Sequence, residues 1–473
     1  MNNTYHDLIK QTFDFPQEGF RVEDNYLQFN DVNLMDIIAK YGTPLKLTYL
    51  PKISSQIQKA KASFRRAFKE LKYEGKYHYC YCTKSSHFTH ILEEVLENDT
   101  HMETSYAFDI DIVRKLYERG LFEKDRYIIC NGFKTKLYTT KIAKLINDGF
   151  TNVIPVLDNK EEIDRYQRSV KGECNIGIRI AAEEEPSFQF YTSRLGIRWR
   201  DILEFYVQKI HDNKKFKLKM LHFFINTGIK DDAYYWSELN KALNVYCQLR
   251  KICPTLDSIN IGGGFPIKNS LAFDYDYDYM IKEIVTQIKS VCKKNRIPVP
   301  DIFTEFGSFT VGESGVAVYK VIAQKQQNDN ELWYMIDSSF ITTLPDTWGI
   351  GQRFLMLPVN KWDKEYQRVN LGGLTCDSHD YYNSEAHINQ VFLPKVSTGE
   401  PLYIGFFHVG AYQDQLAGYG GIKHCLIPSP QHILVDHDAK GNLRDRVFAK
   451  QQSASSMLKI LGYEQKAVTA KRR

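Results

Sequence analysis

Short apolar runs alternate with amphipathic stretches from residue 76 to residue 307 of the 473-residue chain. Most of these runs are apolar on both faces, which is typical of strands buried on both sides of a parallel sheet. The amphipathic stretches between them, such as FTHILEEVLEN and FDIDIVRKLYERG, predict helices. The pattern therefore predicts eight strands, at residues 76–83, 101–105, 126–130, 152–157, 176–181, 219–225, 257–263 and 301–307.

Eight strands alternating with helices predict a closed parallel α/β barrel of the TIM type, (β/α)8, and an open doubly wound sheet is the alternative. After about residue 310 the runs GVAVYKVIAQKQ, ELWYMID and EPLYIGFFHVGAY predict strands without long helices between them. We therefore expect a C-terminal, mostly antiparallel β-barrel domain. The strand-like stretch NYLQFND (25–31) is expected to add a strand to it. The predicted domains are an N-terminal segment (1–45), a cofactor-binding barrel (46–310) and a β-domain (311–473).

Composition adds little to this picture. The chain is 43% hydrophobic and 25% charged, and its net charge of +5 is spread along the sequence, which argues against a nucleic-acid partner. No apolar run approaches the ~20 residues that a membrane span needs. Nine scattered cysteines without a C-x-x-C pair argue against a zinc ribbon and a disulfide framework. Reduced thiols in a cytoplasmic protein are expected.

A barrel of this type carries its functional groups just after the strands, at the C-terminal face. Lys84 follows the first predicted strand, in YHYCYCTKSSHF (77–88), where the period-two alternation ends at small polar turn residues. Such a lysine is either a solvated loop residue or one that binds a cofactor covalently. Further polar and glycine residues at strand ends favour the second interpretation: Ser105, Asn131, Thr227, Gly262–Gly264 and Glu305.

A lysine amine can form a Schiff base with an aldehyde cofactor such as pyridoxal 5'-phosphate, PLP. Gly262, Gly263 and Gly264 would let backbone N–H groups approach phosphate oxygens, because no Cβ intervenes. Glu305 would keep the pyridine nitrogen protonated. Taken singly, a glycine triplet more often indicates a tight turn, and Glu305 is at least as consistent with a salt bridge.

Several motifs resemble those of the fold-type III PLP-dependent decarboxylases: YGTPL (41–45), YCTKSS (81–86), GGGFP (262–266), CDSHD (376–380) and GAY (410–412). Longer segments are similar to the biosynthetic arginine decarboxylases of that family: IICNGFK (128–134), TTLPDTWGIGQ (342–352), LTCDSHD (374–380) and GFFHVGAYQD (405–414). The resemblance spans about residues 40 to 425. It implies an alanine-racemase-like barrel with a β-domain, and decarboxylation of L-arginine to agmatine and CO2 in polyamine biosynthesis.

The resemblance also implies roles for single residues. Lys84 matches the Schiff-base lysine, and Cys376 matches a cysteine that enters the neighbouring subunit's site and protonates the product carbon. Asp346 and Asp377 match acids that face the distal cationic group of the substrate. The other matched positions contact the cofactor: Arg179, Phe224, Thr227, Gly262, Gly263, Gly264, Glu305 and Tyr412.

Two positions depart from the family pattern. Phe224 stands where the family has a histidine stacked on the cofactor, and a phenyl ring can stack but cannot donate a hydrogen bond. His222, two residues earlier, is expected about 7 Å further down the strand and is not expected to replace it. Ser308 replaces an arginine that helps to hold a substrate carboxylate in diaminopimelate decarboxylases, which argues against that substrate.

Three alternatives stay open: decarboxylation of ornithine, lysine or carboxynorspermidine, racemisation on the same fold, and a non-catalytic regulatory homologue. We expect a small-molecule amino acid substrate, no nucleic acid or membrane partner, and a homodimer with shared active sites or a higher oligomer of such dimers. Magnesium is implied by the resemblance only, and no residue is predicted to bind a metal.

Overall fold

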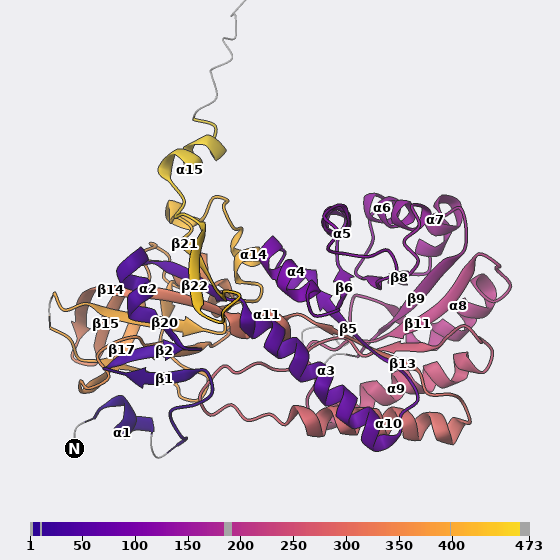
Figure 1. Ribbon diagram of the computed structural model, residues 1–473, viewed down its shortest axis with the longest axis horizontal. Coiled ribbons are helices and arrows are strands. Elements are labelled where there is room, and N and C mark those ends of the chain that lie inside the picture. Colours follow the sequence, from indigo (N-terminus) through magenta and orange to yellow (C-terminus); the bar gives the residue numbers. More distant parts are fainter. Residues whose placement is uncertain (1–2, 10–11, 184–191, 398, 464–473) are drawn as a thin grey trace, which may run out of the picture. The chain divides into compact units, whose positions relative to one another are not determined.

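The computed structural model describes residues 3–9, 12–183, 192–397 and 399–463 (Figure 1). The chain divides into two compact units. The barrel unit contains residues 53–266 and 275–310, and the sheet unit contains residues 1–52, 267–274 and 311–473. Within the described ranges, no helix combines the length and the apolar character that crossing a bilayer requires.

The barrel unit is built on eight parallel strands that close into a ring. The strands are hydrogen-bonded in chain order, β8 pairs with β9, and β13 pairs with β5 to complete the ring. A short strand, β10 (Ile197–Arg198), extends the sheet beside β9. The predicted (β/α)8 barrel is thereby confirmed, and every ring strand overlaps its predicted range. The ring consists of β5 (Tyr77–Cys82), β6 (His101–Thr104), β7 (Ile128–Cys130), β8 (Val153–Leu157), β9 (Cys174–Ala181), β11 (Phe216–His222), β12 (Ser258–Asn260) and β13 (Asp301–Phe306).

Helices alternate with these strands and lie outside them (Figure 1). Several start at a side chain that accepts a hydrogen bond from the first turn, as Thr135, Asp232 and Asp276 do. The helices of this unit are α3 (Pro51–Leu71), whose first two residues belong to the sheet unit, α4 (Thr89–Leu96), α5 (Ala107–Glu118), α6 (Lys136–Asn147), α7 (Glu162–Ser169), α8 (Ile202–Lys209), α9 (Ala233–Arg250) and α10 (Tyr277–Asn295).

Side chains at every second strand position fill the interior of the barrel. Side chains alternate between the two faces of a strand. If one residue points into the barrel, the residue two positions later therefore also points inward, closer to the C-terminal end of the strand. At four strands that next residue is polar, namely Asn131, Asp158, His222 and Glu305. The buried apolar cluster beneath them comes from five strands: Cys80, Ile129, Ile154, Val156, Met220 and Phe303.

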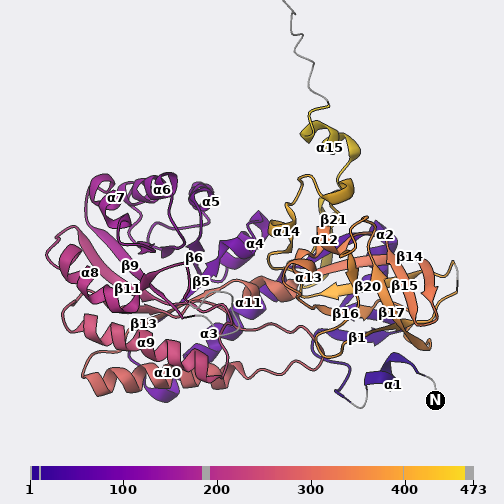
Figure 2. The same cartoon turned by 180° about the vertical axis from the view of Figure 1, so that it is seen from behind.

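The sheet unit contains a ten-stranded sheet, seen from the other side in Figure 2. Seven of its nine strand pairings are antiparallel, while β15–β17 and β4–β21 are parallel. The prediction of a mostly antiparallel domain is therefore confirmed. The strands are β4 (Leu45–Tyr49), β14 (Gly315–Asn328), β15 (Glu331–Ile336), β16 (Leu355–Pro358), β17 (Tyr366–Gly372), β18 (Tyr381–Tyr382), β19 (Val391–Pro394), β20 (Leu402–Phe407), β21 (Gln431–His437) and β22 (Leu443–Ala449).

The sheet is packed on both faces. Along β14, Val316 and Val318 belong to one buried cluster, and the intervening Ala317 and the next residue, Tyr319, belong to another. Period-two alternation thus supplies two cores from one strand.

Two details of the sheet unit differ from the prediction. Residues 25–31 form strand β2 (Tyr26–Phe29) of a small separate sheet, with β1 (Phe20–Glu23) and β3 (Val32–Asn33). Among the described residues, β2 makes a single bridge outside that sheet, from Tyr26 to Asn360, and the Leu27 amide donates to the Val359 carbonyl (2.8 Å). The N-terminal strand that joins is β4, which pairs with β14 and β21. Among the described strands the pairings also leave the sheet open rather than closed into a barrel, because β22 pairs with β21 alone.

Candidate active site

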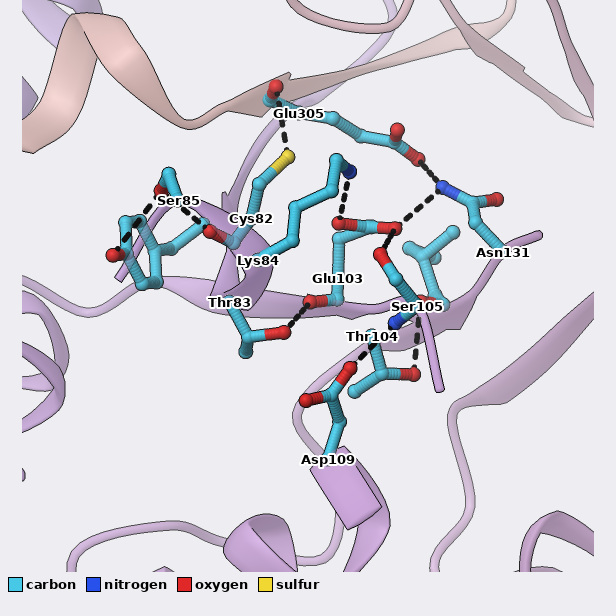
Figure 3. A network of polar contacts seen from close by, with 12 residues as sticks. Cys82, Thr83, Lys84, Ser85, Glu103, Thr104, Ser105, Asp109, Asn131 and Glu305 are labelled. Carbon is cyan, nitrogen blue, oxygen red and sulfur yellow. Dashed lines mark hydrogen bonds and ion pairs between the residues drawn. The ribbon is translucent and has the colours of Figure 1, made fainter. Parts of the chain in front are cut away.

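Lys84 lies in a 3-10 turn, η1 (Thr83–Ser85), directly after β5. The small polar residues of this turn are buried and satisfy the backbone: the Thr83 hydroxyl donates to the carbonyl of Glu103 (3.1 Å) and the Ser85 hydroxyl donates to the carbonyl of Cys82 (2.7 Å). The Ser85 bond is a local side-chain-to-backbone bond of the kind that short hydroxyl side chains form, whereas the Thr83 bond joins the turn to β6. The hydrogen bonds of Thr83 and Ser85 therefore fix the turn (Figure 3). The Lys84 side chain is 43% exposed.

Glu103, at the end of β6, is the partner of the lysine. Lys84 Nζ lies 2.7 Å from Glu103 Oε2, and the carboxylate is fully buried. Its other oxygen accepts hydrogen bonds from the Ser105 hydroxyl (2.9 Å) and the Asn131 amide (3.1 Å). A buried carboxylate requires such partners. Glu103 was not a predicted site residue, although it lies two positions after His101 on the inward face of its strand.

Glu305, at the end of β13, lies in the same network. One carboxylate oxygen accepts hydrogen bonds from the amides of Asn131 (2.8 Å) and Asn260 (2.5 Å). Because Asn131 also donates to Glu103, one continuous set of polar contacts runs from Lys84 to Glu305 across the barrel interior (Figure 3).

His222 faces the second oxygen of Glu305, with Nε2 at 3.5 Å from Oε2. Burial, and next the positive charge of Arg179, hold the pKa of His222 well below its ordinary value. The imidazole is therefore neutral at physiological pH. His222 thus lies beside Glu305, the residue expected to meet the pyridine nitrogen, one pleat below Phe224.

Phe224 follows the end of β11 and is half-buried. The guanidinium carbon of Arg179, from the neighbouring strand β9, lies 5.8 Å from the centre of its ring. This is a cation–π distance. The two predicted cofactor contacts are therefore neighbours, and the aromatic ring has a defined orientation.

The glycine loop after β12 brings three backbone segments close together. A Cβ at Gly263 would collide with the carbonyl of Glu305, and a Cβ at Gly264 would lie 2.6 Å from the Cα of Gly228. Gly264 also has a φ of +112°, which other residues rarely adopt. The amide of Ile229 donates to the Gly264 carbonyl (2.9 Å), so this loop and the one after β11 are hydrogen-bonded.

The residues at this end of the barrel fit PLP. The hydroxyl of Thr227, one residue before Gly228, is buried and has no hydrogen-bond partner among the described residues, which is costly unless a ligand supplies one. An anion with several acceptor oxygens, such as a phosphate, would satisfy it. The Lys84 amine suits the aldehyde of the cofactor, the Thr227 hydroxyl suits its phosphate, and the Glu305 carboxylate suits its pyridine nitrogen.

In the sheet unit, Asp380 organises the CDSHD loop after β17. The buried Asp380 carboxylate accepts hydrogen bonds from the amides of Phe340 (2.8 Å) and Thr375 (3.0 Å) and from the Thr375 hydroxyl (2.7 Å). Asp377 accepts from the amide of His379 (2.8 Å), which is the main cause of its lowered pKa. The loop is therefore fixed at its base, and its first three residues are directed outward or half-exposed.

Cys376 is exposed, and its sulfur lies 3.5 Å from that of Cys425. The contact between the two thiols raises the pKa of Cys376 above its ordinary value. The other seven cysteines are buried free thiols.

Asp346 lies in α13 (Pro345–Gly349) and is fixed by Gln413. The Gln413 amide donates to Asp346 Oδ2 (2.7 Å), and its oxygen accepts from the Asp346 amide (3.3 Å). Tyr412 immediately precedes Gln413, starts α14 (Gln413–Ala417) and has a φ of +66°. Asp346 and Tyr412 are therefore linked through one glutamine within the sheet unit.

The predicted site residues thus fall into two groups. The barrel unit brings together Lys84, Arg179, Phe224, Thr227, Gly262, Gly263, Gly264 and Glu305 at the C-terminal ends of its strands. The sheet unit holds Cys376, Asp377 and Tyr412 on its loops and Asp346 in α13.

Comparison with known proteins gives a consistent result. A family model for the pyridoxal-dependent decarboxylase, pyridoxal binding domain, matches residues 54–312. A biosynthetic arginine decarboxylase of Prochlorococcus marinus (strain AS9601) is 22% identical, over 92% of this chain and 85% of that protein.

Two solved structures share the fold over nearly the whole chain. The biosynthetic arginine decarboxylase of Campylobacter jejuni has a TM-score of 0.80 and 21% identity, and the match covers 95% of this chain and 89% of that one. A diaminopimelate decarboxylase from M. jannaschii, in complex with L-lysine, has a TM-score of 0.76 and 16% identity, covering 93% and 97%.

Proposed function

Because this chain belongs to the pyridoxal-dependent decarboxylases, it is a PLP-dependent carboxy-lyase, and we propose that its substrate is L-arginine, which it converts to agmatine and CO2. The observation that carries the choice of substrate is the similarity to a protein named biosynthetic arginine decarboxylase over 92% of this chain. The proposed domains are the barrel (46–310) and a β-domain formed by residues 311–473 with the N-terminal segment (1–45). Residues 46–52 and 267–274 are the exceptions, because they belong to the compact sheet unit.

The barrel residues would hold the cofactor. Bound PLP supplies an electron sink for the pair that is left when the carboxylate departs as CO2. Lys84 would bind its aldehyde carbon, and Glu305 would hold its pyridine nitrogen. The remaining predicted contacts are Thr227, Gly262, Gly263, Gly264 and Tyr412 for the phosphate, and Arg179 and Phe224 for the ring.

Glu305 is prepared for its role by its neighbours. Two amide donors orient one carboxylate oxygen, and the other oxygen lies beside His222. A protonated His222 would compete for that oxygen. Since burial keeps this imidazole neutral, the second oxygen of Glu305 would accept a hydrogen bond from the protonated pyridine nitrogen.

Glu103 would act on Lys84 rather than on the substrate. At 2.7 Å, and without exposure to water, its carboxylate holds the lysine amine in position at the mouth of the barrel. When the substrate amine replaces Lys84, Glu103 would keep the released amine within reach of the reacting carbon. Glu103 is thus a positioning residue.

Asp346 and Asp377 would select a cationic side chain. Within the described residues, their side-chain hydrogen bonds engage Oδ2 of Asp346 and Oδ1 of Asp377, which leaves the other oxygen of each for a ligand. A guanidinium offers a planar pair of N–H donors that suits such oxygens. A neutral side chain would leave the remaining oxygen of each acid without a partner, at a cost of about 1–3 kcal/mol for each.

The assembly that we propose is a two-fold dimer in which Cys376 of one chain completes the site of the other. This arrangement would bring the proton-donating thiol to a barrel that supplies Lys84. A two-fold axis would then create two equivalent sites.

A substrate panel tests the proposal. The PLP-loaded protein should release CO2 from L-arginine and form agmatine, with kcat/KM at least about tenfold above the values for ornithine, lysine and diaminopimelate. The Lys84→Ala variant serves as the control for background release. Preference for another amino acid would overturn the substrate, and bound PLP without any CO2 release would favour the regulatory homologue.

Borohydride reduction followed by peptide mapping tests the cofactor site separately. The label is expected on Lys84, whereas a label on another lysine would overturn this assignment.

A further inference from the structure

Three potential metal donors converge on the sheet unit. Cys376 comes from the loop after β17, and His424 and Cys425 come from a short 3-10 turn, η4 (His424–Leu426). Their ligand atoms all lie within 4.8 Å of one another, and all three residues are exposed. In the part of the chain that the structure describes, this is the one group of three or more histidine, cysteine or acidic donors with such geometry.

The donor set is specific in its chemistry. Two thiolates and an imidazole suit zinc, whereas magnesium and calcium prefer oxygen ligands. With bonds of about 2.0–2.3 Å, the ligand atoms of a tetrahedral zinc ion lie about 3.3–3.8 Å apart. The separation of the Cys376 and Cys425 sulfurs, 3.5 Å, falls in this range. A disulfide would require about 2.05 Å and would leave His424 without a role.

The backbone on both sides of the cluster is fixed. Consecutive side chains of an extended strand point in opposite directions, but Cys425 has a left-handed conformation (φ 53°, ψ 19°), and both His424 and Cys425 lie near Cys376. The preceding residue, Lys423, is buried and donates to the carbonyl of Thr342 (3.0 Å). On the other side, Asp380 fixes the loop of Cys376. The donors therefore stand on two anchored segments.

We propose that Cys376, His424 and Cys425 form a binding site for a thiophilic divalent cation of the zinc class, and that occupancy inhibits the enzyme. Two S–H protons pass to solvent as two sulfur–metal bonds form, and no electrons are transferred. The inhibitory effect rests on the proposed function, in which the Cys376 thiol delivers a proton to the product carbon. A metal-bound thiolate has no such proton.

Cobalt is the probe for binding, because Co²⁺ occupies tetrahedral sulfur and nitrogen sites and then absorbs visible light. Titration of the reduced, PLP-loaded protein with Co²⁺ should give one equivalent of tetrahedral absorption per chain, which Zn²⁺ displaces. Cys425→Ser and His424→Ala should each weaken cobalt affinity by more than about 100-fold. Loss of a residue that only hydrogen-bonds to a metal ligand typically costs less, about 10–100-fold. His211→Ala, which changes an exposed histidine of the barrel unit, should leave it unaltered.

Inhibition is measured for each protein against its own activity in the presence of a chelator. Zn²⁺ should inhibit the wild-type protein and the His211→Ala variant at concentrations that leave Cys425→Ser active, and the chelator should restore activity. Unchanged cobalt spectra in Cys425→Ser and His424→Ala would overturn the site.

Other outcomes separate the two proposals. Stoichiometric cobalt binding in a protein that decarboxylates no amino acid would leave the metal site standing and overturn the proposed function. Decarboxylation of arginine by a protein that takes up no metal would leave the proposed function standing and overturn the metal site. A loss of two hydrogens per chain, mapped to a Cys376–Cys425 disulfide in protein that takes up no metal, would replace the metal site by a thiol pair.

Discussion

In the barrel unit, Glu103 and Glu305 are at most 5% exposed. Their carboxylates accept hydrogen bonds from Asn131 and Asn260 at the ends of other strands, and Glu103 also accepts one from the nearby Ser105. In the sheet unit, Asp377 is 35% exposed, and it accepts hydrogen bonds from His379, only two residues away. Glu103 and Glu305 are fixed by the strands of the closed barrel, whereas Asp377 lies on a loop. A barrel that closes on itself can complete a polar network within one unit, but a loop leaves acceptor oxygens available to a ligand.

This contrast assigns different tasks to the two units. Groups that hold a resident cofactor benefit from a buried, satisfied network, because such a network is rigid. Groups that meet a substrate at each turnover must be accessible. We therefore expect variants in the barrel unit to affect PLP retention and variants of Asp346 and Asp377 in the sheet unit to affect the use of substrate. Tyr412 is the exception, because this sheet-unit residue is proposed to contact the phosphate.

Complementation between subunits gives the largest expected effect. Lys84→Ala and Cys376→Ala should each lower activity by about 1000-fold or more, because each removes a group that acts directly in the reaction. After exchange in equal amounts, half of the dimers are mixed and each holds one intact site, so activity should recover to roughly a quarter of wild type. Release of CO2 from arginine measures the recovery.

A mixture of Lys84→Ala with Lys84→Met is the matched control, because the two variants share their defect. Mixtures that are shown to exchange and that stay inactive would mean that one chain supplies both groups.

Removal of the proposed substrate acid comes next. Asp377→Ala should lower kcat/KM for arginine by about 30- to 1000-fold, since an unpaired guanidinium costs about 2–4 kcal/mol. PLP content should be unchanged. Asp329→Ala, at an exposed turn of the same unit, is the control. If Asp377→Ala loses PLP instead, the division of tasks between the units is wrong.

Acid should weaken the sheet unit through His432. Burial lowers the pKa of this histidine to about 4. Below about 6.5 the unfolded chain therefore binds a proton that the folded chain does not, and stability falls until the pH reaches about 4. Between pH 7 and pH 5 the wild-type protein should lose about 2 kcal/mol more unfolding free energy than His432→Gln. Urea unfolding at both pH values measures this, with the exposed His437→Gln as control; equal losses would contradict it.

The smallest effect concerns the aromatic ring beside Arg179. Phe224→Ala should weaken PLP binding about tenfold, which corresponds to about 1.4 kcal/mol of lost ring contact. Phe224→His should bind PLP within about threefold of wild type, because its ring can still stack. Equilibrium dialysis measures the affinities, and the exposed Phe108→Ala is the control. Wild-type affinity in the alanine variant would show that Phe224 does not contact the cofactor.

The barrel was predictable because its strands are short apolar runs at regular intervals, and each run became a ring strand. The alternation of side chains along these strands also indicates two site residues that were not predicted, Glu103 and Asn260. Glu103 and Asn260 both lie on inward-facing strand positions near the C-terminal end, and counting in steps of two from His101 and Ser258 reaches them. The network around Lys84 could therefore have been inferred from strand parity.

The sheet unit was less predictable, because its contacts join distant segments. Nothing in the local pattern indicates that β4 rather than residues 25–31 enters the large sheet, since both are strand-like. The contact between Cys376 and Cys425 joins two loops that are 49 residues apart, and its geometry depends on how each loop is anchored. Such pairings are decided by tertiary packing rather than by propensity.

The placement of β4 has a consequence for synthesis on the ribosome. Its residue Thr48 pairs with Gly315, and Leu45 pairs with Gln431. Both edges of β4 therefore stay unpaired until strands β14 and β21 have been synthesised. At about 5–20 residues per second, roughly 270 residues take on the order of 10–50 s to be added before β14 is complete enough to pair. The barrel lies between these partners in the chain and can fold during that interval. An apolar strand with two open edges is meanwhile exposed to other chains. We therefore expect nascent chains of this protein to be most prone to aggregation after the barrel has formed and before β14 has emerged, and to depend on chaperones in that interval.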